Sequence, residues 1–206
     1  MNILANTLTI VILADWNKLY VQPDWVAMNI FEKTEMEIGV ETQGVEYSIS
    51  YKCEDVTINP TQDKVIITAA NLNSKTIDLF VRCATNYFTK AITPHLSAWG
   101  LNIDYIESEN TLLADIFDSI TDSKAYIGLN YEITNTQIER TLVKDNRVIN
   151  IQYSQKSSQT LIHFNEHHNC PNENDRSVSK ESIWSFITLT KEIVAAIGYE
   201  LEAEDE

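Results

Sequence analysis

The segment Leu161–Ser177, "LIHFNEHHNCPNENDRS", holds three of the four histidines and one of the three cysteines of the chain. Imidazole and thiolate are preferred ligands of Zn²⁺, so a metal site would be sought here first. The first part of the segment is typical of a strand, in which each residue rises about 3.3 Å and alternate side chains change face. His163 and His167 would then share a face about 13 Å apart, too far for one ion, and His168 would face the other way.

A metal site in this segment would have to use His168 and Cys170 at the entrance to the loop, with Glu166 or Asp175 as a further ligand. A structural zinc site normally takes four ligands, and the spacing here is neither CxxC nor a helical HxxxH. We therefore expect no metal. We expect the imidazoles to cap the end of the strand and to bond to the polar loop "NCPNEND".

The rest of the chain carries no catalytic motif. GxSxG, P-loop and GxGxxG sequences are absent, and five glycines are few for loops that cradle phosphate. Cys83 precedes His95, but it lies in an apolar helical stripe and is expected to be a packing thiol, whereas a nucleophile must be accessible. We therefore predict a protein without cofactor or catalytic residues, that is, not an enzyme.

Composition predicts a cytoplasmic protein. Three cysteines, without CxxC spacing, argue against a disulfide framework. The N-terminal residues lack the basic region and cleavage site of a secretory signal, and no apolar run is long enough to span a membrane. The net charge of −15, from 30 acidic and 15 basic residues, would repel nucleic acid. The acidic surface either solubilises the protein or receives a basic partner.

The first half of the chain reads as strand, helix, three strands and long helix. A strand is expected at residues 8–14, followed by a short helix beginning at Pro23 in which Trp25, Met28 and Phe31 recur at helical spacing. Alternation of apolar and polar residues predicts strands within 35–42, 44–60 and 63–70. The long helix, with Ser74 as its N-cap and its end at Thr93–Pro94, is predicted from an apolar stripe made of Ile77, Phe80, Val81, Ala84, Tyr87, Phe88 and Ala91.

The second half repeats this order. Residues 97–106 read as a strand and 110–120 as a short helix capped by Asn110. Residues 129–167 read as a three-stranded meander with turns at "KDNR" and "QKSSQ". A long helix follows at 179–198, with Ser179 as N-cap and Gly198 as C-terminal cap.

The predicted fold class is therefore α+β, with two similar βαβββα halves whose antiparallel sheets lie under two long helices. The halves are predicted at residues 1–95 and 96–200, within one compact unit, with an acidic tail at 201–206. The order is similar to that of the duplicated TATA-binding-protein-like fold. This similarity concerns the fold alone and does not imply a function.

Three aromatic residues, Trp16, Tyr20 and Trp25, cluster around the first connection between strand and helix. Tryptophans in such a place usually fill the core, but exposed ones would be good anchors for a partner. Both alternatives stay open at this point.

The segment Thr89–Tyr105, "TKAITPHLSAWGLNIDY", resembles a signature of uncharacterised, sporadically distributed bacterial proteins of about this size. In these, a long helix ends in a Thr-Pro-His turn and is followed by a small residue, a spacer, glycine and a strand with asparagine. The matching positions here are Thr93, Pro94, His95, Ser97, Ala98, Gly100 and Asn102. "WNKLYVQPDWVAMNIF" and "HFNEHH" also look like that group, which implies a bacterial accessory protein and carries no known activity.

We expect the protein to act by protein–protein contact, with its acidic surface holding a basic partner, as an immunity, antitoxin or defence-associated accessory protein. One alternative is a small-molecule-binding protein or enzyme on the concave face of the sheet, with His95, Asn102 or Tyr105 at the mouth of the pocket. Another is a structural homodimer that pairs through a free sheet edge or an exposed helix.

Overall fold

The computed structural model describes residues 1–4, 6–43, 46–91, 96–107, 129, 135–144, 147–156, 159–170, 172 and 176–201. The chain divides into two compact units. Unit 1 comprises residues 1–4, 103–165 and 187–206, and unit 2 comprises residues 5–102 and 166–186. Strand β7 (Leu96–Glu107), strand β10 (Gln159–Asn169) and helix α5 (Lys180–Ala196) each have residues in both units.

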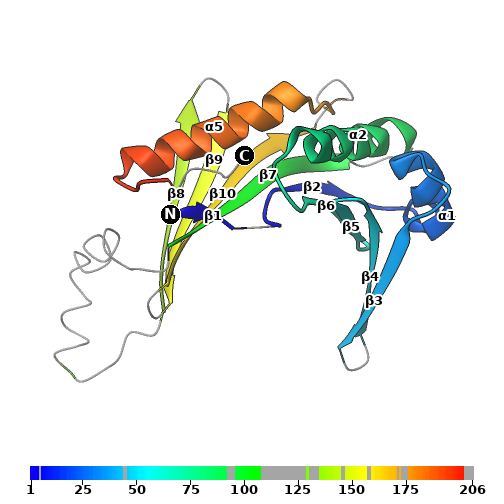
Figure 1. The fold of residues 1–206 in the computed structure, drawn as a ribbon, viewed down its shortest axis with the longest axis horizontal. Coiled ribbons are helices and arrows are strands. Elements are labelled where there is room, and N and C mark those ends of the chain that lie inside the picture. The colour runs from blue at the N-terminus through cyan, green and yellow to red at the C-terminus, as the bar shows by residue number, and fades with distance from the viewer. Residues whose placement is uncertain are drawn as a thin grey trace. The chain divides into compact units, whose positions relative to one another are not determined.

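Unit 2 is built on an antiparallel sheet with the strand order β3-β4-β5-β6-β2-β7 (Figure 1). Its strands are β2 (Thr9–Ala14), β3 (Glu37–Gln43), β4 (Glu46–Cys53), β5 (Val56–Pro60), β6 (Lys64–Ala69), the first part of β7 and the end of β10. Buried and less buried residues alternate along β2 and β6, so one face of each strand is turned to the core. Helix α2 (Ser74–Lys90) lies against β5 and β6 on that face.

The apolar stripe of α2 forms the core of unit 2, as the helical spacing predicts. Ile77, Phe80 and Tyr87 are fully buried on it. The N-cap lies one residue before the predicted one, because Asn73 and not Ser74 accepts the hydrogen bond from the backbone N–H of Thr76, at 2.9 Å. The prediction of Ser74 as N-cap is therefore wrong by one position, and the chemistry of the cap is the one expected.

The short helical segment after β2 differs from the predicted α-helix. It consists of a 3₁₀ turn η1 (Lys18–Val21), a single α-turn α1 (Pro23–Trp25) and a π-helix η2 (Val26–Phe31). The wider π turn buries Val26, Ala27, Ile30 and Phe31 and leaves Met28 63% exposed. The predicted helical spacing of Trp25, Met28 and Phe31 assumed a period of 3.6 residues, which the π-helix does not keep.

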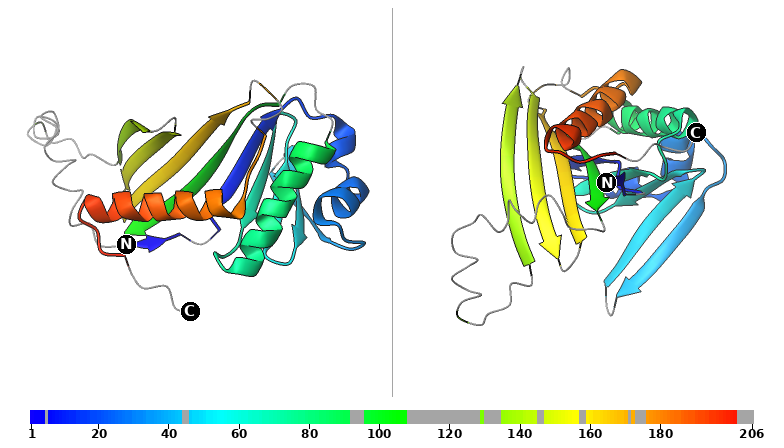
Figure 2. Two further views of the ribbon diagram at one scale, coloured as in Figure 1. Left: turned by 90° about the horizontal axis from the view of Figure 1, so that it is seen from above. Right: turned by 60° about the vertical axis from the view of Figure 1, so that its left-hand side comes forward.

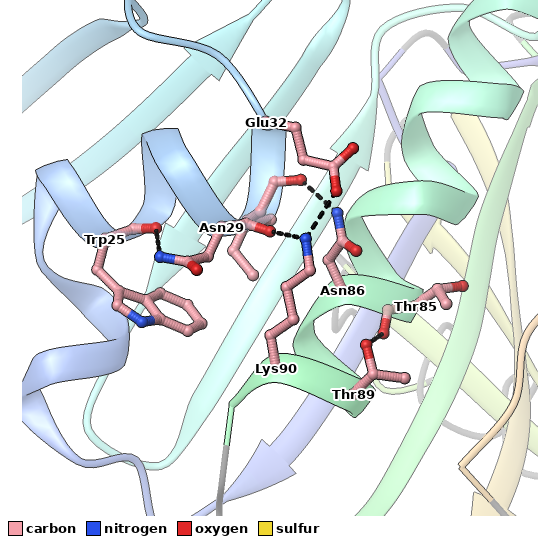
Figure 3. Close-up of polar contacts among 8 residues, drawn as sticks. Trp25, Asn29, Glu32, Thr85, Asn86, Thr89 and Lys90 are labelled. Atoms are coloured by element: carbon pink, nitrogen blue, oxygen red, sulfur yellow. Dashed lines mark hydrogen bonds and ion pairs between the residues drawn. The ribbon is translucent and has the colours of Figure 1, made fainter.

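The C-terminal end of η2 is held by polar side chains of α2 (Figure 3). The buried Asn86 amide donates to the carbonyl oxygen of Ile30 at 2.9 Å. Lys90 Nζ donates to the carbonyl of Asn29 at 2.9 Å and forms an ion pair with Glu32 at 2.7 Å, and this cation holds the pKa of Glu32 below its usual range. The carbonyls that a helix leaves unpaired at its C-terminus thus find their donors on α2.

Replacing Asn86 by leucine is expected to lower the free energy of unfolding by about 1–3 kcal/mol, because the buried carbonyl of Ile30 loses its donor. Thr85→Ala, an exposed change on the same helix, is the control and should alter it by less than about 0.5 kcal/mol. Urea titration measures both values. Equal stability of the two variants would show that the Asn86 amide does not hold η2.

Unit 1 contains β1 (Asn2–Ile3), β8 (Asn135–Lys144), β9 (Arg147–Lys156), and the remaining parts of β7 and β10. The order is β7-β10-β9-β8, with β1 paired antiparallel to β7. Figure 2 shows α5 lying against the strands of this unit. The Tyr105 hydroxyl and the Thr190 hydroxyl share a buried hydrogen bond of 2.8 Å that joins β7 to α5.

Helix α5 is capped at both ends as predicted. The Ser179 hydroxyl oxygen accepts from the backbone N–H of Ser182 at 3.1 Å. At the other end Gly198 has a φ of 99°, which favours glycine, and the backbone N–H of Tyr199 donates to the carbonyl of Val194 at 3.2 Å. The cap residues read from the sequence are confirmed here.

The α+β class is confirmed, and one strand count is corrected. The predicted strand at 44–60 is two strands, β4 and β5, which turn at Glu54 with a φ of 53°. Among the described residues, four strands, β3 to β6, therefore lie between η2 and α2 instead of the predicted three. In the second half the three-stranded meander is confirmed as β8, β9 and β10. The predicted helix at 110–120 lies outside the described residues, and the duplication of the halves stays a prediction.

The predicted boundary between residues 95 and 96 falls inside unit 2, and the boundaries of the two units cut through β7, β10 and α5. Among the described helices, none combines the length and the apolar character needed to cross a membrane.

Candidate functional site

The histidines of the opening segment lie on β10 and have three different surroundings. In unit 1, His163 Nδ1 lies 2.5 Å from Asp104 Oδ1 of β7, in a partly buried hydrogen bond. His167 Nε2 lies 3.0 Å from Asn169 Oδ1. The predicted bonds to the polar loop thus describe His167, whereas His163 bonds to a neighbouring strand instead.

His168 lies in unit 2 with its imidazole stacked on the indole of Trp99, the ring centroids 3.9 Å apart and the planes 5° from parallel. Its Nε2 lies 3.5 Å from the carboxylate of the buried Glu166. Cys170 is buried, and its backbone N–H donates to the carbonyl of Ser97 at 3.1 Å. Among the described residues, no group of three or more His, Cys, Asp or Glu side chains could hold a metal ion. Asp175, the further ligand considered for His168 and Cys170, lies outside that part of the chain.

The aromatic residues Trp16, Tyr20 and Trp25 gather in one cluster with Tyr87 of α2. Tyr20 and Trp25 meet edge to face with centroids 5.0 Å apart, and the ring of Tyr87 lies 5.4 Å from Trp16 and 6.1 Å from Trp25. Trp16 is only 5% exposed and Tyr87 is fully buried. Trp16 therefore serves as packing between the first connection and α2, and only the half-buried Tyr20 and Trp25 could meet a partner.

Two polar atoms of this cluster, Trp16 Nε1 and the Tyr87 hydroxyl, are buried without a hydrogen-bond partner among the described residues. Burial also raises the pKa of Tyr87. A buried hydroxyl without a partner costs about 1–3 kcal/mol.

Tyr87→Phe should therefore keep or raise the free energy of unfolding, whereas Tyr87→Leu, which removes ring contacts, should lower it by more than about 1 kcal/mol. A loss of stability in Tyr87→Phe, measured by thermal unfolding, would mean that the hydroxyl is bonded.

The residues predicted at the mouth of a concave pocket are engaged in the fold. The Asn102 amide donates to Thr9 Oγ1 at 3.1 Å, and Tyr105 is fully buried with its hydroxyl bonded to Thr190. His95 lies outside the described residues. Cys83 is fully buried, and desolvation raises the pKa of its thiol, so it is a packing thiol as the sequence predicts.

The edge strand β3 presents different chemistry on its two faces. Among the described strands it pairs only with β4, so it forms one edge of the unit 2 sheet. Glu37 and Glu41 are exposed on one face. Ile38 and Val40 lie on the other face and are 53% and 62% exposed. An open edge with exposed aliphatic side chains is a template for a further strand.

Behind the exposed edge, β4 extends the aliphatic face inward. Ile38 lies opposite the buried Tyr51, and Val40 lies opposite the half-buried Ile49. The Tyr51 hydroxyl donates to the carbonyl of Val21 at 2.7 Å, which fixes the ring from the side of η1. An added strand would therefore place its own apolar side chains beside a surface that is already formed and rigidly held.

Strands β3 and β4 form a hairpin, and the glutamates on its acidic face, Glu37 and Glu41, form no ion pair with a lysine or arginine among the described residues. Residues 37–53 contain three glutamates and one lysine, Lys52. Lys52 lies opposite Glu37 in the ladder, yet among the ion pairs of the described residues none within 4.0 Å joins the two. Glu41 lies opposite Ser48, a neutral residue. The glutamates of β3 are thus available to external cations.

The sequence points to an acidic surface and to alternation in residues 35–42, but it does not single out β3 as the place where the two coincide. The signal that could have found it is the alternation of glutamate with aliphatic residues, at positions 37, 38, 40 and 41. Comparison with protein-family models finds no match for this chain, and comparison with curated proteins finds none either.

Proposed function

We propose that this protein is a non-catalytic interaction protein that holds a basic partner protein, and that the partner adds an extended segment to the free edge of β3. The observation that carries the proposal is the exposure of Ile38 and Val40 on an edge strand whose other face carries Glu37 and Glu41. Backbone hydrogen bonds along the edge would give affinity, and alternate side chains would give specificity. The role fits an accessory protein of a bacterial multi-gene system, such as an immunity, antitoxin or defence-associated protein.

The side chains of β3 define the segment that fits. Because cross-strand neighbours in an antiparallel pair share a face, lysine or arginine of the partner would lie beside Glu37 and Glu41. Aliphatic residues at the alternate positions would cover Ile38 and Val40, which already contact β4 on one side only. The proposed ligand is therefore an extended segment in which basic and aliphatic residues alternate.

A second copy of the chain fits this edge less well. An antiparallel pairing of two β3 strands centred on Gly39 would place Glu37 of each copy opposite Glu41 of the other. Like charges directly opposite each other destabilise a ladder. The same glutamates that favour a basic segment thus disfavour the homodimer through this edge.

The test uses a seven-residue peptide of alternating lysine and valine, equal in length to β3, and a matched peptide with glutamate in place of lysine. We expect the lysine peptide to bind and its affinity to fall as salt is raised, because exposed charges are screened. Glu37→Lys with Glu41→Lys should weaken binding about tenfold or more, since two favourable pairs become repulsive. Isothermal titration calorimetry at low and high salt measures both effects.

The matched control replaces two exposed acids away from β3, as Asp15→Lys with Glu192→Lys, and changes the net charge by the same amount. This control should lose only the part of the affinity that depends on net charge. If both double variants weaken binding equally, or if the glutamate peptide binds as well as the lysine peptide, β3 is not the binding edge.

A further inference from the structure

Unit 1 contains a cavity of about 310 Å³ between the C-terminal part of α5 and the strands β8 and β9. Its walls are mainly aliphatic, with Ile138 and Leu142 from β8, Ile151 from β9, Ile193 from α5, and Ile197 just after the end of α5. Ile151 is buried, whereas Leu142 is 41% exposed at the rim, so the cavity opens to solvent beside the edge strand. A concave apolar surface of this size is typical of a small-molecule site.

Two polar groups enter this aliphatic lining, Arg140 and Tyr153. Arg140 lies directly opposite Ile151 in the ladder, and Tyr153 lies opposite Ile138, so the two are diagonal neighbours on the face turned to α5. Burial raises the pKa of Tyr153, and the guanidinium of Arg140 acts in the opposite direction, which places the two groups within electrostatic reach of each other.

The charge of Arg140 is not neutralised within the part of the chain that the structure describes. No hydrogen bond or ion pair of Arg140 occurs among the described residues. The adjacent Glu139 points to the other face of β8, where it accepts from the Gln137 amide at 2.8 Å and the Gln152 amide at 3.1 Å. In a chain with a net charge of −15, this cavity thus presents a positive group where most of the surface would repel anions.

We propose that this cavity binds a small amphiphilic carboxylate, with its aliphatic body among the isoleucines and its carboxylate on Arg140 and the Tyr153 hydroxyl. A guanidinium can hold a carboxylate by two parallel hydrogen bonds, and the tyrosine hydroxyl is a further donor. The volume suits about ten non-hydrogen atoms at roughly 30 Å³ each. This inference rests on unit 1 alone and does not depend on the proposed partner at β3.

The probe is octanoate, tested on the full chain by methyl NMR of the isoleucines and by calorimetry. We expect saturable binding that shifts the methyl signals of Ile138, Ile193 and Ile197. Arg140→Gln, an exposed change that leaves the core intact, should weaken binding about tenfold or more. Lys144→Gln removes the same charge from the same strand but not from the cavity lining, and it should leave the affinity within about twofold.

Three results would overturn the proposal. The first is the absence of saturable binding at millimolar octanoate, and the second is equal binding of octylamine, which carries the opposite charge. The third is a shift of the same methyl signals with protein concentration in the absence of octanoate, because a second copy of the chain would then occupy the cavity.

Discussion

Burial of one face of an antiparallel sheet beneath a helix is the interaction on which each unit depends. In unit 2 the helix is α2, with Phe80 and Tyr87 fully buried, and in unit 1 it is α5, joined to β7 by the Tyr105–Thr190 hydrogen bond. A helix is about 10 Å across and neighbouring strands lie about 4.8 Å apart, so one helix covers about two or three strands. On strands farther out, some apolar side chains, such as Ile38 and Val40, stay exposed beyond the reach of the described helices.

Both candidate sites, the edge of β3 and the cavity beside β8, lie where the helix no longer covers the sheet. On β3 the uncovered aliphatic residues accompany glutamates on the other face, which suits a basic segment and opposes pairing with a second copy. At β8, helix α5 extends far enough for Ile193 to close one side of a cavity. Arg140 gives this cavity a positive charge, opposite to that of the glutamates on β3. The same limit on helix cover therefore leaves two sites of different chemistry, one in each unit.

The sequence predicts what depends on local periodicity. Helix α2 follows from a stripe of apolar residues, and the cap residues Ser179 and Gly198 of α5 follow from local backbone chemistry. The turn at Glu54 was missed because no glycine or proline marks it, although its φ is 53°. The π-helix at Val26–Phe31 was missed because the spacing of Trp25, Met28 and Phe31 also fits an ordinary α-helix. The bond between His163 and Asp104 could not be predicted, because its partners are 59 residues apart and meet only through the order of the strands. The identity of the edge strands has the same origin, since alternation shows that a strand has an apolar face but not what covers it.

Hydrogen exchange of the β3 amides, followed with and without the alternating lysine–valine peptide, tests whether a basic segment adds a strand to the edge of β3. Amides on the side of β3 that faces away from β4 lack partners among the described strands and should exchange rapidly in the free protein. We expect the peptide to protect these amides and to leave those of β8 unchanged. Protection that spreads equally over β3 and β8, or no protection at β3, would show that the peptide does not add a strand to this edge.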